Sequence, residues 1–441
     1  MKMNKSVIIL LMSAILSLLH ISTRGQENVK LQDCIAIALK DNYSVTISSN
    51  ELSISKNNIS LAPFLPTVTL GSKQSTSELH ERSYNAQGEV GKDISKATTI
   101  LSSANLNWRL FDGFYMFAER EKQRELLQQG EFSFRSVVEN LVMDISSQYY
   151  KIISLQNQVK LLDELVGISN TRYSQALTRY KIGKDSGLEY MQAKINLNSD
   201  SSQLLLQRQN LKNAYIELFR LMNVDLNSSY IIKDTIVPEP MMSLENILVA
   251  GFQNNTSILA ARVGERVAGL ELKIAKSSRY PTLDFSTGYN YNLYDNDYFP
   301  SKYDRYNGYN FGFNLSVPIF DGLEVNRKIK NAKILQENTR LSFEKTKQDL
   351  ESQLRSVYNL YTNNIRMVDF ESENKEAAFL NLEAAMEKYR LGSLSGIEFR
   401  DIQLSYLDAS NRMLDAIYQA KISEITLHLL MGDLFQPVPQ K

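Results

Sequence analysis

Histidine and cysteine are the residue types that most often ligate metal ions or serve as nucleophiles, and this sequence is poor in both. It contains three histidines, His20, His80 and His428, and one cysteine, Cys34. Their separations match no metal-ligand spacing and no catalytic triad, and we place His80 in a loop. The sequence also lacks a glycine-rich phosphate loop. We therefore predict a protein that is not an enzyme, holds no metal and needs no cofactor.

The charge of the chain also limits its partners. Lysine plus arginine and aspartate plus glutamate number 49 each, so the formal net charge is zero. A nucleic-acid-binding protein would carry an excess of positive charge, and we therefore exclude nucleic acid as a partner. The single cysteine excludes an intramolecular disulfide and a thiolate zinc cage. We interpret Cys34 as a buried helix residue, and we do not expect a lipid on it.

The N-terminal residues have the pattern of a secretory signal. Lys2 and Lys5 precede an apolar run at 7–19, and the small residues Ser22 and Gly25 follow. The run is too short for a permanent membrane-spanning helix, although a buried N-terminal helix is an alternative interpretation. We predict an exported protein. Because no later run reaches about 18 apolar residues, any insertion into a membrane must use β-strands.

The two halves of the chain repeat each other, and such repeats bear on the whole fold. The matching segments are 105–113 with 314–322, 179–183 with 388–392, both at a shift of 209, and 39–45 with 252–258. Pro238 and Pro240 lie between the halves and mark a linker. The predicted domains are a signal peptide (1–25), a first repeat (26–225), a linker (226–243), a second repeat (244–432) and a C-terminal tail (433–441).

Each repeat contains segments in which apolar and polar residues alternate, as in a β-strand with two different faces. The alternation is clear at 282–293, 309–319 and 104–110, and weaker in the strand expected to pair with the last of these. Stripes of this length fit tilted membrane strands, and tyrosines crowd the hairpin from Tyr289 to Tyr309 as at a lipid interface. Such strands could instead cover a soluble core. The predicted membrane strands include Leu106, Trp108, Phe285, Tyr289, Phe311, Phe313 and Leu315.

A long helical pattern follows each β-hairpin and ends at a glycine. Gly113 to Gly183 and Gly322 to Gly392 are each 70 residues apart, which corresponds to about 105 Å of helix. In the first of these stretches, apolar residues recur at alternating steps of three and four, and charged residues such as Arg172 flank this coiled-coil seam. A glycine after a basic last turn ends a helix. We therefore predict a helix hairpin at each glycine turn.

Two β-hairpins supply only four strands, which cannot close a membrane barrel. The unpaired backbone groups at the open edges would face hydrocarbon at a cost of several kcal/mol each. Several copies of the chain must therefore share one barrel, and the long helix pairs would form a second, coaxial cylinder outside the membrane. A plain helical bundle would show the same seam.

The doubled plan of short helix, β-hairpin, long helix, glycine turn and returning helix resembles the TolC family of outer-membrane efflux channels over essentially the whole mature chain. The resemblance implies a mainly α homotrimer whose shared twelve-stranded β-barrel contacts outer-membrane lipid and continues into an α-helical coiled-coil barrel in the periplasm. It implies efflux of small molecules, or type I secretion, with a periplasmic adaptor and an inner-membrane pump. The alternative is a soluble periplasmic coiled-coil adaptor or scaffold.

The resemblance also assigns roles at the hairpin tips, which it places at the periplasmic entrance of the pore. The corresponding pore-entrance positions are Glu398, Asp401, Glu189 and Tyr389, the last being a tyrosine that ties the tip closed. Three copies of the acids would form rings that attract cations, although a solvated helix face is the simpler interpretation. Leu394 stands where the family's closed gate has an arginine, so the usual charged latch is in doubt. The other predicted tip residues are Gly183, Gly187, Gly392, Ser395 and Gly396.

Overall fold

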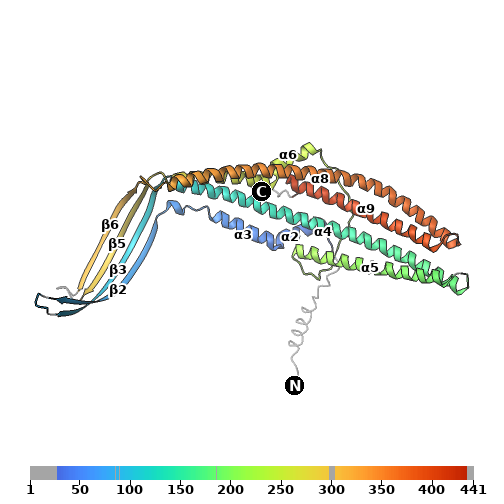
Figure 1. The fold of residues 1–441 in the computed structure, drawn as a ribbon, viewed down its shortest axis with the longest axis horizontal. Coiled ribbons are helices and arrows are strands. Elements are labelled where there is room, and N and C mark those ends of the chain that lie inside the picture. Colours follow the sequence, from blue (N-terminus) through green and yellow to red (C-terminus); the bar gives the residue numbers. More distant parts are fainter. Residues whose placement is uncertain (1–26, 85, 89, 185, 297–302, 435–441) are drawn as a thin grey trace, which may run out of the picture. The chain divides into compact units, whose positions relative to one another are not determined.

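The computed structural model describes residues 27–84, 86–88, 90–184, 186–296 and 303–434 (Figure 1). The predicted signal peptide and the last residues of the predicted tail lie outside the described residues. Within them, no helix combines the length and the apolar character needed to cross a membrane. The chain divides into a helical unit (Met1–Ser49, Phe134–Thr256 and Lys347–Lys441) and a sheet unit (Asn50–Ser133 and Ser257–Thr346). Each unit draws on both sequence repeats.

The sheet unit contains one antiparallel sheet of four strands in the order β2-β3-β5-β6 (Figure 1). The strands are β2 (Thr67–Tyr84), β3 (Val90–Asp112), β5 (Thr282–Asn296) and β6 (Tyr303–Ser316). The β3–β5 pairing therefore joins the hairpin of the first repeat to that of the second. Among the described residues, β2 and β6 each have a neighbour on one side only.

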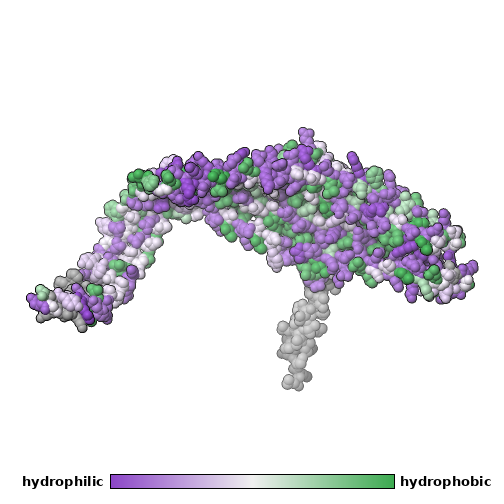
Figure 2. Space-filling view, in the orientation of Figure 1, coloured by the Kyte–Doolittle hydropathy of each residue, from purple (hydrophilic) through white to green (hydrophobic). Residues whose placement is uncertain are grey.

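One face of this sheet is apolar and uncovered. Trp108 lies opposite Phe285, which lies opposite Phe313, and the two phenylalanine rings are 5.1 Å apart. Since side chains alternate between faces, the register places all seven predicted membrane-strand residues on this face. Tyr309 and Phe311 on the same face are 80% and 70% exposed. In the space-filling view, further hydrophobic residues gather where the strands meet the long helices (Figure 2).

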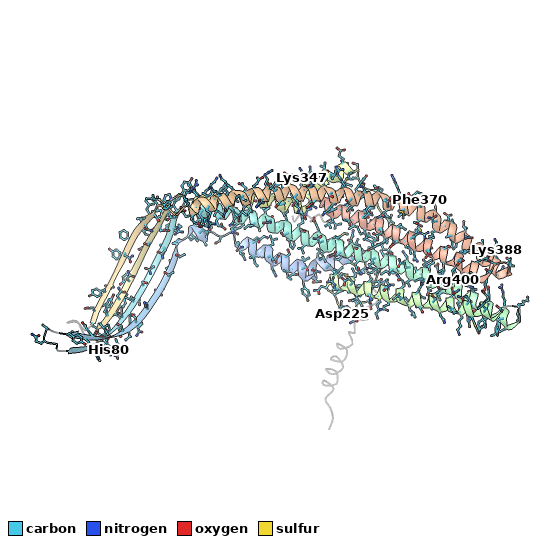
Figure 3. The ribbon with its side chains drawn as sticks, in the orientation of Figure 1. His80, Asp225, Lys347, Phe370, Lys388 and Arg400 are labelled. Atoms are coloured by element: carbon cyan, nitrogen blue, oxygen red, sulfur yellow. The ribbon has the colours of Figure 1, made fainter. Side chains whose placement is uncertain are left out.

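Two expectations about the strands were wrong. His80, expected in a loop, lies in β2 opposite Ile94 of β3 (Figure 3). Polar residues occupy both faces of this part of β2, so no alternation marks it as a strand, and pairing with β3 decides its structure. The second strand of the other hairpin ends at Ser316 rather than at Ile319, because Pro318 has no N–H to donate to a ladder.

The sequence Phe-Asp-Gly occurs once in each repeat, at 111–113 and 320–322, and directly precedes the long helices α4 (Tyr115–Lys181) and α8 (Glu324–Leu391). Its aspartates cap them: Asp112 accepts a hydrogen bond from the Met116 N–H at 3.1 Å, and Asp321 accepts one from the Val325 N–H at 2.6 Å. Gly113 has a φ of +70°, which glycine adopts without steric cost. A side chain at this position would also overlap the Ser277 carbonyl oxygen.

The helical unit is built from helix pairs around a core on α4. The other elements of the chain are α2 (Leu31–Asp41), α3 (Tyr43–Asn57), α5 (Gly187–Met222), α6 (Leu244–Asn254), α7 (Thr256–Ser277), α9 (Gly396–Met431), the short helix η1 (Ala62–Phe64), β1 (Glu27–Asn28) and β4 (Tyr230–Ile231). Ile145, Tyr149 and Ile152, which belong to the predicted seam, are fully buried. Cys34 in α2 is also fully buried, as expected, and its burial raises the thiol pKa to about 12.

One hydrogen-bonded contact in the helical unit occurs in both repeats. The Asn42 side chain donates a hydrogen bond to the Leu221 carbonyl at 2.9 Å, and the Asn255 side chain donates one to the Leu430 carbonyl at 3.0 Å. Each asparagine follows a short helix and satisfies a carbonyl at the end of its repeat's returning helix, where no intrahelical partner exists. In both repeats, therefore, the same contact connects the end of the short helix to the end of the returning helix.

A histidine–aspartate contact at the end of α9 should make the stability of the protein depend on pH. His428 Nδ1 lies 2.9 Å from Asp433 Oδ1, and this hydrogen bond, opposed by burial, raises the pKa of His428. Because the folded-state pKa is raised, the stabilisation is complete below the unfolded-state pKa of about 6.5 and is lost as the pH rises through the folded-state value. We expect the free energy of unfolding, measured by urea titration from about pH 5 to about pH 8, to fall more for the wild type than for Asp433→Asn. Parallel pH profiles for the two proteins would contradict this.

Candidate functional site

Both predicted glycine turns are present in the helical unit. Gly183 and Gly392 have φ values of +72° and +80°, and each follows the last residues of a long helix. In both turns the residue after the glycine donates a backbone hydrogen bond to the carbonyl five residues earlier, from Lys184 to Arg179 at 2.9 Å and from Ser393 to Lys388 at 3.0 Å. This is the glycine-dependent ending of a helix. It turns α4 back into α5 and α8 back into α9, and Figure 3 labels Lys388 and Arg400 near the second turn.

The acids expected at the pore entrance lie on the first turns of α9. The Ser395 hydroxyl accepts a hydrogen bond from the Glu398 N–H at 3.2 Å, and Glu398 Oε2 accepts one from the Ser395 N–H at 3.1 Å. This reciprocal capping fixes the start of the helix. The hydrogen bonds from Ser395 also lower the pKa of the Glu398 carboxyl, so this group is ionised near neutral pH. Asp401, one turn later, is also exposed.

Glu189 and Tyr389 lie instead in a buried cluster between the two helix hairpins, the first formed by α4 and α5 and the second by α8 and α9. The Tyr389 hydroxyl donates a hydrogen bond to Glu189 Oε1 at 3.2 Å, and Arg172 Nη2 donates to the same oxygen at 3.2 Å. Burial, followed by the negative charge of Glu189, raises the pKa of Tyr389. The Arg172 guanidinium lies 5.7 Å from the centre of the Tyr389 ring and 5.9 Å from that of Phe399. Glu189 is therefore a link between hairpins in this structure.

A second arginine, Arg179, binds the backbone at the C-terminal end of α8. Arg179 Nη2 donates hydrogen bonds to the carbonyl oxygens of Tyr389 at 2.7 Å and Arg390 at 3.1 Å, and its guanidinium lies 5.1 Å from the centre of the Tyr389 ring. The last carbonyls of a helix lack intrahelical partners and carry partial negative charge, so a cation is favourable there. Arg172 and Arg179 are one heptad apart on α4 and contact Tyr389 together.

Sequence reasoning missed these two arginines because the heptad pattern placed them on the flanks of a seam, where charges are normally solvated. Their spacing of seven residues is evident in the sequence, but nothing in the sequence indicates that the second helix hairpin packs against them. Two other predicted tip residues pack against the cluster: Leu394 is partly buried against it, and Gly396 lies against Arg172 and Glu189. Gly187, the matching residue of the first turn, faces the Tyr180 ring.

The described residues offer little chemistry beyond these contacts. They contain no group of three or more His, Cys, Asp or Glu side chains that could hold a metal ion. The tips present exposed carboxylates on α9 and buried arginine–tyrosine contacts between the helix hairpins, and the sheet unit presents an uncovered apolar face.

Comparison with known proteins identifies the family. A family model described as outer membrane efflux protein matches residues 55–224 and 250–433. The chain belongs to the outer membrane efflux protein family. It is 23% identical over 318 residues to the outer membrane protein TolC of Vibrio cholerae serotype O1, covering 70% of this chain and 71% of the relative. It is 21% identical over 405 residues to TolC of Escherichia coli strain K12, covering 88% and 78%.

Solved structures confirm the predicted fold of this efflux protein. The Campylobacter jejuni CmeC outer membrane channel superposes with a TM-score of 0.76 at 16% identity, over 92% of this chain and 86% of that one. The fold is therefore TolC-like, with the mainly α architecture and β-domain predicted from the sequence. As a member of its family, this efflux protein is an outer-membrane channel protein that extends into the periplasm.

Proposed function

We propose that three copies of this efflux protein form one non-enzymatic channel, with a shared barrel of twelve strands in the outer membrane. The observation that carries the proposal is a sheet with one uncovered apolar face and a single neighbour for each of β2 and β6 among the described residues. The strands alternate in direction across the sheet, so β2 and β6 run in opposite directions. β6 of one copy can therefore pair antiparallel with β2 of the next, and such pairing satisfies backbone groups that lipid cannot.

The hairpin tips are the proposed entrance for solutes from the periplasm. Glu398 and Asp401 are exposed on successive turns of α9, and three copies around one axis would form two acidic rings. A ring of carboxylates in a narrow pore attracts cations and disfavours anions. We assign to the pore small molecules as its main cargo and secreted polypeptides as the alternative cargo.

The tips also offer a surface for the proposed periplasmic adaptor, which would connect the channel to an inner-membrane pump. Ile182 and Leu188 beside the first turn are 62% and 76% exposed, and Leu391 and Ile397 beside the second are 77% and 71% exposed. Large apolar side chains grouped on an exposed surface favour contact with another protein. An adaptor that contacts the tips would cover these four residues.

A planar-bilayer experiment tests the channel and its entrance together. We expect the purified wild type, extracted from outer membranes as a trimer, to give cation-selective conductance, and Glu398→Ala with Asp401→Ala to move the reversal potential in a salt gradient towards zero. The double variant of the exposed pair Asp163 and Arg208, both changed to Ala, is the control and should leave selectivity unchanged. A wild type that is water-soluble and forms no pores would instead support a periplasmic scaffold. An unchanged reversal potential would remove the two acids from the entrance.

A further inference from the structure

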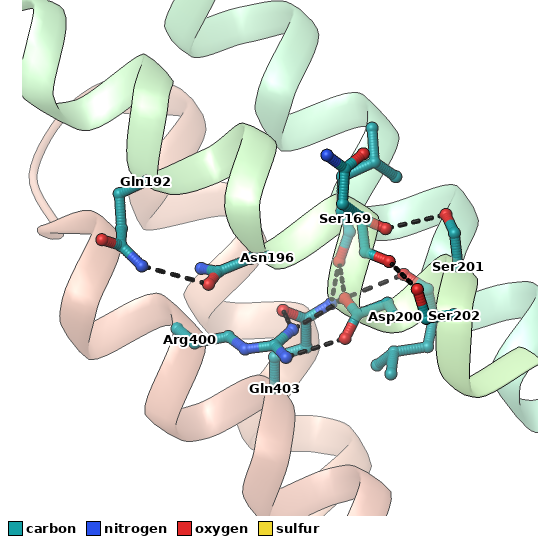
Figure 4. A network of polar contacts seen from close by, with 11 residues as sticks. Ser169, Gln192, Asn196, Asp200, Ser201, Ser202, Arg400 and Gln403 are labelled. Carbon is teal, nitrogen blue, oxygen red and sulfur yellow. Dashed lines mark hydrogen bonds and ion pairs between the residues drawn. The ribbon is translucent and has the colours of Figure 1, made fainter.

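Charged side chains of this protein differ in whether the chain itself supplies their partners. Asp200 of α5 is fully buried, and both of its carboxylate oxygens accept hydrogen bonds from Arg400 of α9, at 2.8 Å and 2.7 Å (Figure 4). In the sheet unit, Lys276 near the end of α7 is exposed and forms no ion pair with the described residues. Lys273, one turn earlier, lies 3.8 Å from Glu121 of α4, and the two side chains are 65% and 58% exposed. These two lysines can therefore bind a negative charge from outside the chain.

The two lysines line a groove between α4 and α7. The groove has a volume of about 350 Å³ and is also lined by Phe114, Phe117 and Tyr280, each at least half exposed. The centre of the Phe114 ring lies 6.4 Å from that of Phe117 and 6.1 Å from that of Tyr280. Aromatic side chains grouped on an exposed surface favour contact with an apolar partner. The groove therefore offers both an apolar surface and cations to a single ligand.

The apolar part of the groove lies nearer to the strands along the chain than the cationic part. Phe114 follows the end of β3 by two residues, and Tyr280 precedes the start of β5 by two. Lys276 and Lys273 lie farther back along α7, where each residue adds about 1.5 Å. A phospholipid has the same order, because its acyl chains lie in the hydrocarbon that membrane strands cross and its phosphate lies beyond them. The groove thus matches the polarity of a lipid.

The backbone of Phe114 is strained, and this strain favours an apolar ligand. Phe114 and its counterpart Leu323 both have a φ of +70°, a conformation that glycine adopts freely and bulky residues rarely do. Both side chains are more than half exposed, so burial within the chain compensates little of the strain. A hydrocarbon chain that covers Phe114 would remove its ring from water and compensate more. Strained residues of this kind are concentrated at binding sites.

Within the described residues, α7 covers only one of the two junctions between a strand and a long helix. A side chain at Gly113 would overlap the Ser277 carbonyl oxygen, because the end of α7 packs against this junction. A side chain at Gly322, the matching residue of the second repeat, would meet no described atom within 4 Å. Leu323 therefore has the strained conformation without the groove, and it provides an internal comparison for Phe114.

We propose that this groove binds one anionic phospholipid of the periplasmic leaflet in each chain, with its phosphate at Lys273 and Lys276 and an acyl chain against the aromatic rings. Two lysines against one glutamate, Glu121, leave the groove a net charge of +1, which complements the single negative charge of a phosphodiester. A zwitterionic phospholipid adds an ammonium group, which the lysines repel. The inference rests on the proposed function, because that function places β3 and β5 in the outer membrane.

Native mass spectrometry of the wild-type trimer in detergent, titrated with phosphatidylglycerol or phosphatidylethanolamine, measures the binding. We expect one phosphatidylglycerol per chain and weaker binding of phosphatidylethanolamine. Lys273→Gln with Lys276→Gln should weaken phosphatidylglycerol binding about thirtyfold, from about 1 kcal/mol for each lysine near anionic lipid. The matched control is Lys330→Gln with Lys333→Gln, which removes the same charge from exposed lysines of the same spacing on α8. Its binding should equal that of the wild type.

Phe114→Gly tests the apolar part of the groove. Glycine keeps the positive φ without strain, and loss of the ring should weaken phosphatidylglycerol binding about tenfold, in line with partial burial of a phenylalanine side chain. Leu323→Gly relieves the same strain outside the groove and should leave binding unchanged. Equal weakening in the two glycine variants would place the effect in the backbone of the junctions and would contradict the proposal.

Other outcomes would also overturn the inference. Equal weakening in both lysine double variants would reduce it to a general attraction between a positive surface and anionic lipid. Displacement of the lipid by excess inorganic phosphate, which has no acyl chain, would reduce it to anion binding. Trimers that bind no lipid would indicate that a neighbouring copy of the chain covers the groove. A pore-forming wild type without preference for phosphatidylglycerol contradicts the inference alone, whereas a water-soluble wild type that forms no pores contradicts the proposed function, and the inference fails with it.

Discussion

Replacing Lys421 with methionine is expected to lower the free energy of unfolding by about 3 to 5 kcal/mol, the usual effect of leaving one charge of a buried pair without its partner. The Lys421 and Glu424 side chains are 8% and 5% exposed, and Lys421 Nζ lies 2.7 Å from Glu424 Oε1. The ammonium also donates a hydrogen bond to the Val237 carbonyl at 3.1 Å. Methionine fills a similar volume, so the loss reports the missing charge. Denaturant titration in detergent measures it.

A second substitution tests whether the loss of stability comes from the Glu424 carboxylate, which Lys421→Met leaves without its partner. Adding Glu424→Leu to Lys421→Met removes the unpaired charge, and we expect most of the stability to return, since apolar replacements of buried pairs are often neutral. Glu424 Oε2 also accepts a hydrogen bond from the Glu239 N–H at 2.8 Å, so recovery should be incomplete. Equal stability of the single and double variants would show that the loss arises from packing around Lys421 instead.

The same contacts explain how the segment between the repeats is held. The sequence predicted a linker at 226–243 from Pro238 and Pro240, and apart from β4 this segment contains no helix or strand in the structure. It is nevertheless fixed at several points: β4 pairs with β1, and the Tyr361 hydroxyl donates a hydrogen bond to the Glu239 carbonyl at 2.6 Å. Nothing in the sequence indicated these contacts, because a lysine and a glutamate three residues apart on a helix normally describe a solvated face.

The features that could be predicted from sequence have local causes. Gly183 and Gly392 end helices because glycine adopts a positive φ, which is a property of the residue itself. The alternation around Phe285 and Phe313 predicts strands because one face meets a different environment from the other. Each signal lies within about ten residues, which is the range that periodicity can report. The duplication then made the glycine turns and the second strand of each hairpin appear twice.

The features that could not be predicted depend on which helices become neighbours. The polarity of Arg172 and Asp200 is typical of solvated helix positions, yet both are buried, because the second hairpin packs over the first and supplies Tyr389 and Arg400. The duplication was a misleading guide here. It suggested that Glu189 should act like its counterpart Glu398, whereas the structure gives Glu189 two partners from a buried cluster and leaves Glu398 exposed at a helix start.

Gly396→Ala is expected to disrupt the contact between the hairpin tips and to lower the free energy of unfolding by about 1 to 3 kcal/mol, the cost of unpairing buried polar groups. An added Cβ would overlap Glu189 Oε1 and would come within 2.5 Å of Arg172 Nη2. Those atoms are the ends of long side chains, but Arg172 is enclosed by the Tyr389 and Phe399 rings and has little room to move. Denaturant titration would measure the loss.

Gly187→Ala provides the matched control, because the duplication places Gly187 at the same position of the first turn. Both glycines begin a helix, and neither has a positive φ. At Gly187 the nearest atom to an added Cβ is Tyr180 Cε2 at 3.4 Å, an ordinary contact. Alanine there restricts the unfolded chain without a clash, so stability should be equal or slightly higher. If both variants lost stability equally, the cause would lie in the helix start itself. A loss confined to Gly396 would locate the cost in the space that Glu189 and Arg172 occupy, and therefore in the contact between unlike hairpins.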